Sequence, residues 1–374
     1  YYERFKKFSR LVPQGSPMAA IGNPYQTLSA SNCVVIESPE DSISGIMKTA
    51  TELAQLFKRR AGVGTDISKL RPDGFRVKNA ARTTSGAWSF ADLFSYITGK
   101  IGQSGRRGAL MVTISVHHPD VEQFAKMKAD KTAVTKANVS IRITDEFMRA
   151  VESDSDYEQR WPCEGEAQFS KMVSAKAVWN TIIEMATLHA EPGIIFWDNA
   201  TERLPAESYE DFKSVCVNPC GEIILAKNGS CRLLSINLTG YVRNAFTSES
   251  FFDYKTFEDD AKIAMRLLDN LVDLELELIE RILESCDSPE EVSLWKNRAG
   301  EQGRRTGLGT HGLADTLAQL RIKYDSENAL KWADKTYESL RNSAYSASVD
   351  LAEERGAFPA FDWQAEKGNP FIQD

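Results

Sequence analysis

Hydrophobic and polar positions follow two kinds of pattern along this chain, and together they predict strands that alternate with helices. A short β-branched run predicts a buried strand at 32–37, and further runs predict strands at 110–116, 138–143 and 194–197. Longer stretches with an apolar residue at every third or fourth position predict helices at 43–57, 90–101, 120–128, 173–189, 257–284, 312–320 and 329–353. The alternation over residues 1–240 favours an α/β fold.

The segments between these elements carry turn residues, glycine and charge. Residues 61–64 (AGVG) predict a glycine-rich corner, and residues 72–86 predict a loop. A polar linker is expected at 129–137. Either Asp41 or Ser42 is expected to cap the helix that follows it.

Composition narrows the class of protein. The chain has 374 residues, with 45 basic and 53 acidic side chains and a net charge of -8. That balance argues against a nucleic-acid-binding surface and leaves room for a local basic pocket for one phosphorylated small molecule. No apolar run approaches the roughly 18 residues that span a bilayer, so no membrane association is expected. Six cysteines are too sparse for a disulfide scaffold, which favours a cytoplasmic protein whose cysteines are buried, catalytic or metal-bound.

Two motifs point to sites that their context does not support. Gly307, Gly309 and Gly312 spell GxGxxG, but a polar, arginine-rich stretch precedes them where a dinucleotide-binding fold needs a strand. A helix start packed closely against a neighbour is the favoured interpretation. Three cysteines have irregular spacing and no histidine near them in sequence, so no metal site is expected among them: Cys216, Cys220 and Cys231.

Residues 218–222 (NPCGE) form the most informative segment. In an extended chain Asn218, Cys220 and Glu222 would face the same way and present an amide, a thiol and a carboxylate to one site. A nearby carboxylate raises the pKa of a thiol and disfavours the thiolate nucleophile. The arrangement suits a sulfur that acts as a neutral radical beside a carboxylate base. Two alternatives stay open: a buried cysteine in a tight turn, and a cysteine acyl-transfer enzyme with a histidine brought close by the fold.

Residues 218–223 (NPCGEI) resemble the finger-loop motif of the ribonucleotide reductase catalytic subunit. Further segments resemble the family in the same order and at similar separations: 31–46, 60–72, 106–111, 118–124, 138–148, 191–198, 230–238, 307–320 and 355–359. The resemblance therefore runs through nearly the whole chain. It implies an enzyme that reduces ribonucleotides to 2'-deoxyribonucleotides, as diphosphates or triphosphates, for DNA precursor synthesis.

The resemblance implies a role for each residue that matches the motifs. Cys220 would be the thiyl-radical cysteine, Glu222 the base for the 3'-hydroxyl proton, and Asn218 a partner of the ribose hydroxyls. Cys33 and Cys231 would deliver two electrons and end as a disulfide. The remaining cysteines match no functional position and are expected to be structural: Cys163, Cys216 and Cys286.

The resemblance also implies a substrate site and an effector site. Ser16 and Ser31 are candidates for contacts with substrate phosphate or hydroxyl groups. Asp41 and Arg71 would border a specificity site for a deoxynucleoside triphosphate, where a carboxylate suits a ribose hydroxyl and an arginine suits phosphate. A plain helix cap is the alternative for Asp41. The linker at 129–137 would carry effector identity to the substrate base.

The fold implied by the resemblance is a ten-stranded α/β barrel of the ribonucleotide reductase and glycyl-radical type, with a central finger loop. Residues 1–30 would end an N-terminal helical region and lead into the barrel, and residues 31–374 would form the catalytic barrel. The chain starts with Tyr1 rather than Met, and segments that the family carries after the finger loop are missing. We therefore expect a barrel incomplete at its C-terminus, in a fragment or one part of a split protein.

The proline and glycine around Cys220 resemble the adenosylcobalamin-dependent class. The alternative is a radical from a separate metal-containing small subunit. The expected partners are a thioredoxin- or glutaredoxin-type reductant, a deoxynucleoside triphosphate effector and a second copy of the chain in a homodimer. A nucleotide-binding regulatory or inactive fragment is the alternative function.

Overall fold

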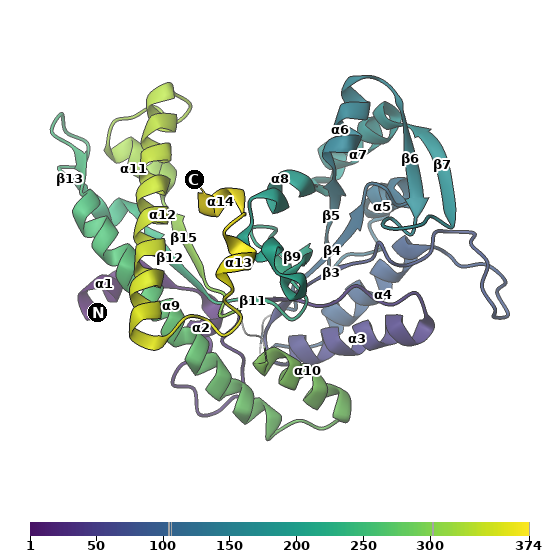
Figure 1. Ribbon diagram of the computed structural model, residues 1–374, viewed down its shortest axis with the longest axis horizontal. Helices are drawn as coiled ribbons and strands as arrows, with labels where there is room; N and C mark the ends of the chain where they lie inside the picture. Colours follow the sequence, from purple (N-terminus) through teal and green to yellow (C-terminus); the bar gives the residue numbers. More distant parts are fainter. Residues whose placement is uncertain (104, 106, 301–302, 374) are drawn as a thin grey trace. The chain divides into compact units, whose positions relative to one another are not determined.

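The computed structural model describes residues 1–103, 105, 107–300 and 303–373, which fall into two compact units (Figure 1). The first unit consists of residues 1–32, 231–285 and 299–361, and the second of residues 33–230, 286–298 and 362–374. Arg106 and Asp374, which belong to segments named above, lie outside the described residues.

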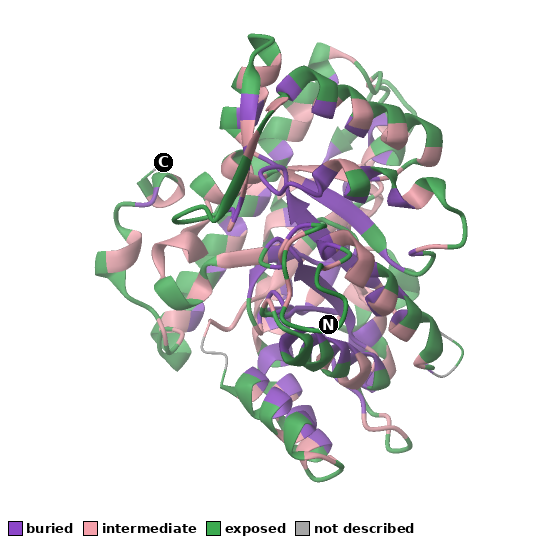
Figure 2. Cartoon of the chain, turned by 90° about the vertical axis from the view of Figure 1, so that its right-hand side faces the viewer, coloured by how far each residue is buried: buried purple, intermediate pink, exposed green. Residues whose placement is uncertain are grey.

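A parallel sheet forms the centre of the second unit. Its strands lie in the order β2 (Cys33–Val35), β3 (Gly62–Asp66), β4 (Leu110–Ser115), β5 (Asn138–Ile143) and β8 (Gly193–Phe196), and each neighbouring pair is parallel. All residues of β2, β3 and β4 are buried, as expected for strands of a parallel sheet that is covered on both faces. Figure 2 shows these buried strands in the interior, with helices whose outer faces are exposed around them.

The helices of this unit connect successive strands. They are α3 (Ile43–Lys58), α4 (Ala87–Lys100), α5 (Val121–Lys126), α6 (Asp145–Glu152), α7 (Ala175–His189) and α8 (Trp197–Glu202). Two antiparallel pairs complete the unit's strands: β6 (Asp156–Trp161) with β7 (Phe169–Ser174), and β9 (Ser214–Val217) with β10 (Ile224–Ala226). Further helices follow later in the chain: α10 (Pro289–Ala299), α13 (Trp363–Glu366) and α14 (Pro370–Gln373).

The first unit packs long helices on a small sheet. Strand β12 (Leu233–Asn237) pairs antiparallel with β1 (Leu11–Pro13) and parallel with β15 (Gly307–His311). Helices α9 (Tyr254–Leu283) and α12 (Glu327–Arg355) pack along each other, and the core gathers apolar side chains from β1, β12 and α9. The other elements are α1 (Tyr2–Phe5), α2 (Gly15–Ala20), α11 (Leu313–Gln319), β13 (Val242–Arg243) and β14 (Phe251–Phe252); β11 (Ser230–Cys231) lies where the chain passes between the units.

Most predicted elements are confirmed, and the corner at 61–64 is wrong. Those residues enter β3, and every residue of that strand is buried. A methyl group added at Gly64 would overlap the carbonyl oxygen of Val217 on β9. The glycine therefore allows two backbones to approach closely, which is a role that the sequence pattern could not separate from a turn. The hairpin of β6 and β7 was not predicted.

The first two GxGxxG glycines lie inside a strand instead of following one. Gly307 and Gly309 lie within β15, and Gly312 precedes α11 with a φ of 80°. An added methyl group at Gly312 would lie 3.1 Å from Asn237 Oδ1. The interpretation as a helix start packed closely against a neighbour therefore agrees with the structure.

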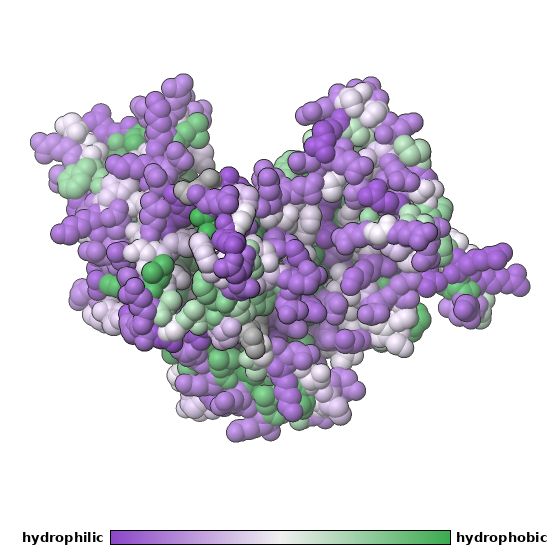
Figure 3. Space-filling view, viewed as in Figure 1, coloured by the Kyte–Doolittle hydropathy of each residue, from purple (hydrophilic) through white to green (hydrophobic). Residues whose placement is uncertain are grey.

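The face in Figure 3 is predominantly hydrophilic. Among the helices of the described residues, none combines the length and the apolar character that crossing a membrane requires.

Candidate active site

The segment that carries Cys220 is a closed turn between β9 and β10. Asn218 N donates to Ile223 O at 3.0 Å, and Ile223 N donates to Asn218 Oδ1 at 3.1 Å. Gly221 N donates to Asn218 O at 2.9 Å, and Gly221 has a φ of 81°, a conformation that glycine adopts without strain. The expectation of an extended segment is therefore wrong, because the antiparallel pairing of β9 and β10 requires the chain to reverse here.

The turn separates the side chains that an extended chain would have aligned. Asn218 is fully buried, whereas Cys220 and Glu222 are exposed at the tip. Asn218 Nδ2 donates to Cys33 Sγ at 3.6 Å, so the structure brings Asn218 and Cys33 together. Cys220 and Glu222 share the exposed tip of the same turn, two positions apart.

Strand β9 is held against the parallel sheet by buried contacts. The hydroxyl of Thr113 on β4 lies 3.3 Å from Cys216 Sγ. Burial raises the pKa of the Cys216 thiol to about 12, so this cysteine stays a neutral thiol at pH 7. The side chain of Asn138, at the start of β5, donates to the carbonyl oxygen of Pro219 at 2.7 Å. Asn138 lies in a segment that carries the resemblance, but no local pattern signals its contact with the turn.

The other predicted catalytic and substrate residues lie in the first unit. Cys231 is buried at the end of β11. Because Cys33 and Cys231 belong to different units, their pairing stays a prediction. Ser16 on α2 is 1% exposed, and its Oγ has no hydrogen-bond partner among the described residues. A buried hydroxyl without a partner costs about 1–3 kcal/mol, which a ligand oxygen could offset.

Ser31 belongs to a buried network that the sequence did not reveal. Glu275 on α9 is fully buried and accepts from Ser29 Oγ at 2.6 Å and from Ser31 Oγ at 2.9 Å. Its second oxygen accepts from Ala30 N at 2.5 Å. A serine hydroxyl has one hydrogen, and here Ser31 donates it to the carboxylate. Ser31 Oγ therefore offers only lone pairs to a further ligand, which suits a ribose hydroxyl donor better than a phosphate.

The two predicted effector residues bind each other. Arg71 Nε donates to Asp41 Oδ2 at 2.7 Å, and Arg71 N donates to Asp41 Oδ1 at 3.1 Å. This hydrogen bond raises the pKa of Arg71 above its ordinary value. The helix cap is Ser42, whose side chain accepts from Gly45 N, so the structure does not support the cap interpretation of Asp41.

One buried carboxylate fastens both ends of the loop at 72–86. Asp120 accepts from Asp73 N at 3.0 Å and from Ala87 N at 2.8 Å. His118 Nε2 lies 2.8 Å from Leu70 O, and His118 Nδ1 accepts from Asp120 N at 3.0 Å, which describes a neutral imidazole. Burial raises the pKa of Asp120 and lowers that of His118. We name this arrangement of His118 and Asp120 the loop clasp.

The cations of the loop lie between these fixed ends. They are Arg76, Lys78 and Arg82. Arg71 NH1 also donates to Arg76 O at 2.8 Å, so the ion pair with Asp41 is joined to the loop backbone. The structure therefore brings the effector candidates and the basic loop into one region of the second unit.

The tip of the Cys220 turn leaves room for a cofactor to approach. Cys220 is exposed, and apart from the adjoining residues 220 and 222 no atom of the described chain lies within 4 Å of a methyl group added at Gly221. No group of three or more histidine, cysteine or acidic side chains that could hold a metal ion occurs among the described residues. The exposed thiol and the space beside Gly221 would allow a bulky group to approach Cys220 from solvent.

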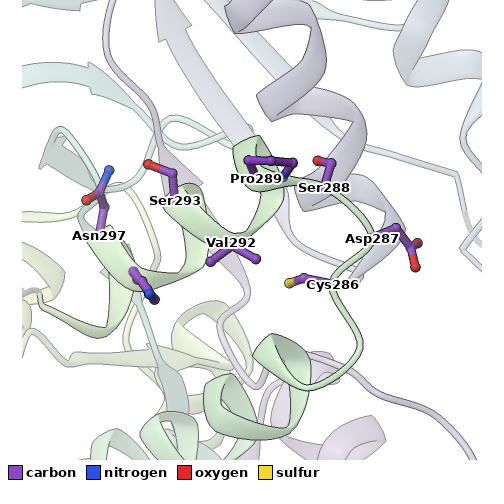
Figure 4. Close-up of a pocket in the computed structure, with 8 residues that line it drawn as sticks. Cys286, Asp287, Ser288, Pro289, Val292, Ser293 and Asn297 are labelled. Carbon is purple, nitrogen blue, oxygen red and sulfur yellow. The ribbon is translucent and has the colours of Figure 1, made fainter.

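Two cavities of the second unit lie apart from the predicted residues. One, of about 690 Å³, opens at the carboxyl ends of β4, β5 and β8, and its lining includes His117, Arg142, Arg160 and Trp197. The other, of about 520 Å³, lies beside the start of α10 (Figure 4) and is lined by Cys286, Asp287, Ser288, Pro289, Val292, Ser293, Lys296 and Asn297. Neither contains a residue of the Cys220 turn.

Fold and turn together define an α/β protein in which a cysteine-bearing hairpin is seated on a parallel sheet. Residues 31–371 match the family model described as "Ribonucleotide reductase, barrel domain". The chain belongs to this ribonucleotide reductase family.

Similar proteins agree with the family. The chain is 34% identical over 324 residues to the vitamin B12-dependent ribonucleoside-diphosphate reductase of Mycobacterium tuberculosis (strain CDC 1551 / Oshkosh), which covers 86% of this chain and 44% of that protein. It is 31% identical over 374 residues to the protein of the same name from Thermoplasma acidophilum, covering 98% of this chain and 45% of that protein. The chain thus spans less than half the length of these relatives.

A solved structure agrees in fold. The Actinobacillus ureae class Id ribonucleotide reductase alpha subunit matches with a TM-score of 0.74 at 19% identity, over 96% of this chain and 60% of that chain. At that identity the likeness supports the α/β barrel-type fold.

Proposed function

We propose that the complete protein carrying this domain reduces ribonucleotides to 2'-deoxyribonucleotides by thiyl-radical chemistry. The observation that carries the proposal is the closed turn, which exposes Cys220 and Glu222 while Asn218 stays buried against Cys33. Exposure gives the thiol access to a substrate, and the turn itself carries no histidine in residues 218–223.

Each residue of the turn has a defined task in this proposal. Cys220, as a thiyl radical, abstracts the hydrogen atom from the ribose 3' carbon. Glu222 accepts the 3'-hydroxyl proton, and the amide of Asn218 holds the turn and faces the ribose hydroxyls. Cys33 and Cys231 supply two electrons and two protons, the 2'-hydroxyl leaves as water, and the pair ends as a disulfide. Glu222 returns its proton to the 3' oxygen, and Cys220 then returns the hydrogen atom to the 3' carbon.

The proposed substrate contacts follow from the hydrogen atoms and lone pairs that each serine hydroxyl can offer to a ligand. Ser16 keeps a hydroxyl hydrogen for an acceptor such as phosphate. Ser31 offers lone pairs to a ribose hydroxyl because its hydrogen goes to Glu275. In the second unit, Asp41 would accept from an effector ribose and Arg71 would bind its phosphates, which requires their ion pair to be exchanged for ligand contacts.

We propose adenosylcobalamin as the radical source, since the relatives from Mycobacterium tuberculosis and Thermoplasma acidophilum are named vitamin B12-dependent. When bound, the cofactor supplies a cleavable carbon–cobalt bond that starts radical chemistry. The exposed tip formed by Cys220 and Gly221 would face it. A separate metal-containing subunit is the alternative source.

The proposal extends to architecture and partners. We propose a ten-stranded barrel completed by segments outside this chain, with residues 1–30 leading into it and residues 31–374 within it. A homodimer, a deoxynucleoside triphosphate effector and a thioredoxin- or glutaredoxin-type reductant are the proposed partners. A regulatory domain that binds effector without turnover is the competing function, supported by the region around Asp41 and Arg71.

The test is an activity assay on the complete protein with ribonucleoside diphosphates and triphosphates, a dithiol reductant, and adenosylcobalamin present or absent. We expect deoxyribonucleotide formation that requires the cofactor. Cys220→Ser should abolish turnover while substrate still binds, and the matched control Cys286→Ser should keep wild-type activity. Effector binding with no turnover under any condition would instead support the regulatory function, and turnover in Cys220→Ser would contradict the proposed chemistry.

A further inference from the structure

The side chain of Asn138 is attached to the peptide that carries Cys220. Its Nδ2 donates to the carbonyl oxygen of Pro219 at 2.7 Å. That carbonyl belongs to the planar peptide unit whose nitrogen is the amide of Cys220. Pro219 also has a φ fixed by its ring. Holding this one oxygen therefore restricts the position of the Cys220 α carbon and the direction of its side chain.

The hydrogen bonds within the turn do not by themselves fix its orientation on the sheet. The bonds between Asn218 and Ile223, and from Gly221 to Asn218, close the turn on itself. Only bonds to other elements fix how the turn sits on the sheet. Asn218 donates to Cys33 on β2, and Asn138 holds Pro219 from β5. The turn is thus attached to two separate strands of the parallel sheet.

Strand pairing and hydrogen bonds of the neighbouring residues hold the backbone at Asn138. It pairs with Met111 in the register of β4 and β5. The next residue, Val139, donates its amide hydrogen to Glu191 Oε1 at 2.9 Å. Lys128 Nζ lies 2.8 Å from Glu191 Oε2 and 2.5 Å from the carbonyl oxygen of the residue before Asn138. A donor held in this way loses little conformational entropy when it binds.

The linker at 129–137 leads directly into Asn138 and is itself attached to α4. Val134 N donates to Asp92 Oδ1 at 2.8 Å, and Lys136 N donates to Ser95 Oγ at 2.9 Å. Contacts between backbone and side chain therefore run without a gap from α4 through the linker to Asn138 and on to Pro219. The linker is therefore a direct backbone route by which a change near α4 can act on the donor that holds the Cys220 peptide.

We propose that Asn138 is a positioning residue for Cys220, and that it transmits changes in the linker to the Cys220 turn. This inference rests on the proposed function for its catalytic consequence. The positioning itself is a property of the second unit. Loss of the donor leaves the fold and the substrate contacts in place and lets the Cys220 peptide rotate.

The experiment compares two variants at Asn138 with a matched control in the complete protein. Asn138→Asp has nearly the same shape but places an oxygen without a hydrogen against the Pro219 carbonyl, and Asn138→Ala removes the side chain. Asn328→Ala, an exposed asparagine on α12, is the control. We expect kcat to fall about tenfold or more in both Asn138 variants with KM within about twofold, because a misdirected thiyl loses the aligned geometry on which transfer depends.

A second measurement does not depend on turnover. Cys220 is an exposed thiol, and its alkylation by iodoacetamide, mapped by mass spectrometry, reports the freedom of the turn. We expect the rate to rise several-fold in both Asn138 variants and to stay unchanged in Asn328→Ala. Addition of dATP or dTTP should alter the rate in the wild type and leave it unaltered in Asn138→Ala.

The outcomes separate this inference from the proposed function. Wild-type kcat and wild-type alkylation in both Asn138 variants would overturn the inference while the reductase function stands. An inactive wild type would count against the function, and the alkylation rates would still decide whether Asn138 holds the turn. A fall in kcat with unchanged alkylation would also overturn the inference, because the peptide would then be held by other contacts. Asn138→Gln, which keeps an amide donor on a longer side chain, should recover part of kcat.

Discussion

Replacing Glu275 by glutamine tests how strongly one buried carboxylate organises the segment that contains Ser31. Glu275 accepts hydrogen bonds from two serine hydroxyls and from the amide of Ala30. In Glu275→Gln the amide oxygen can keep the bond from Ala30 N. The new NH₂ group must then donate to the hydroxyls, which have to turn their hydrogens away. Ser31 would change from a donor toward this side chain into an acceptor.

The magnitude follows from these bonds. A hydrogen bond to a charged group contributes about 1.5–3 kcal/mol, and one between neutral groups about 0.5–1.5 kcal/mol. Three such replacements lose about 3 kcal/mol. Glutamine avoids the desolvation of a buried charge, which returns part of that loss. We expect a net destabilisation of about 2 kcal/mol, and about 3–5 kcal/mol for Glu275→Ala, which leaves the amide of Ala30 without an acceptor and adds a cavity.

Hydrogen exchange at the amide of Ala30 is the suitable assay because it reports opening of this segment in particular. A loss of about 2 kcal/mol corresponds to about 30-fold faster exchange. Glu277→Gln is the matched control: it lies two positions along the same helix, is exposed, and should change exchange by less than about threefold. Denaturant unfolding of the same variants gives the free energy independently. Wild-type exchange at Ala30 in Glu275→Gln, or an equal effect in both variants, would refute the reasoning.

Two further predictions concern the second unit. Gly64→Ala should destabilise the protein by about 3 kcal/mol or more, because its methyl group would overlap the carbonyl of Val217. Gly102→Ala is the control: it has open space around it and should change the free energy of unfolding by less than about 1 kcal/mol. Equal urea midpoints for the two variants would contradict the close approach of β3 and β9. Stability should fall as the pH drops below about 6.5, because burial lowers the pKa of His118 and the unfolded chain then binds more protons than the folded one. The contribution is complete above that pH, so urea midpoints at pH 5.5 and 7.5 should differ less in His118→Gln than in the wild type; an unchanged difference would exclude His118 as the source.

Local patterns predicted what depends on neighbours in sequence. The β-branched runs indicated the strands β2, β4, β5 and β8, because β-branched side chains pack well on a pleated sheet. The motif around Cys220 identified the turn as chemically distinct before its conformation was known. Its conformation was missed because it depends on the pairing of β9 with β10, which an isolated six-residue segment does not encode.

The contacts that orient the site could not be predicted from local sequence patterns, because they join residues that lie far apart in the chain. The bond from Asn138 to Pro219 joins residues 81 positions apart, and that from Ser29 to Glu275 joins residues 246 positions apart. Neither pair has a periodicity or a spacing of its own. Gly64 was misread for the same reason, since the backbone that it accommodates comes from Val217. Long-range contacts become visible only when the strands are placed beside one another.

The loop clasp turns residues 73–87 into a closed ring whose two ends meet on the carboxylate of Asp120. For a flexible segment, bringing the ends together carries an entropy loss that grows with the logarithm of its length. Here the folded protein already holds the two ends together, so this entropy loss has occurred before any ligand binds. A ligand that orders the ring restricts only its interior, so binding is opposed by less disorder than for a free arm of equal length. The ring's cations are therefore kept at a high effective concentration near the ion pair of Asp41 and Arg71, where the proposed triphosphate effector would bind.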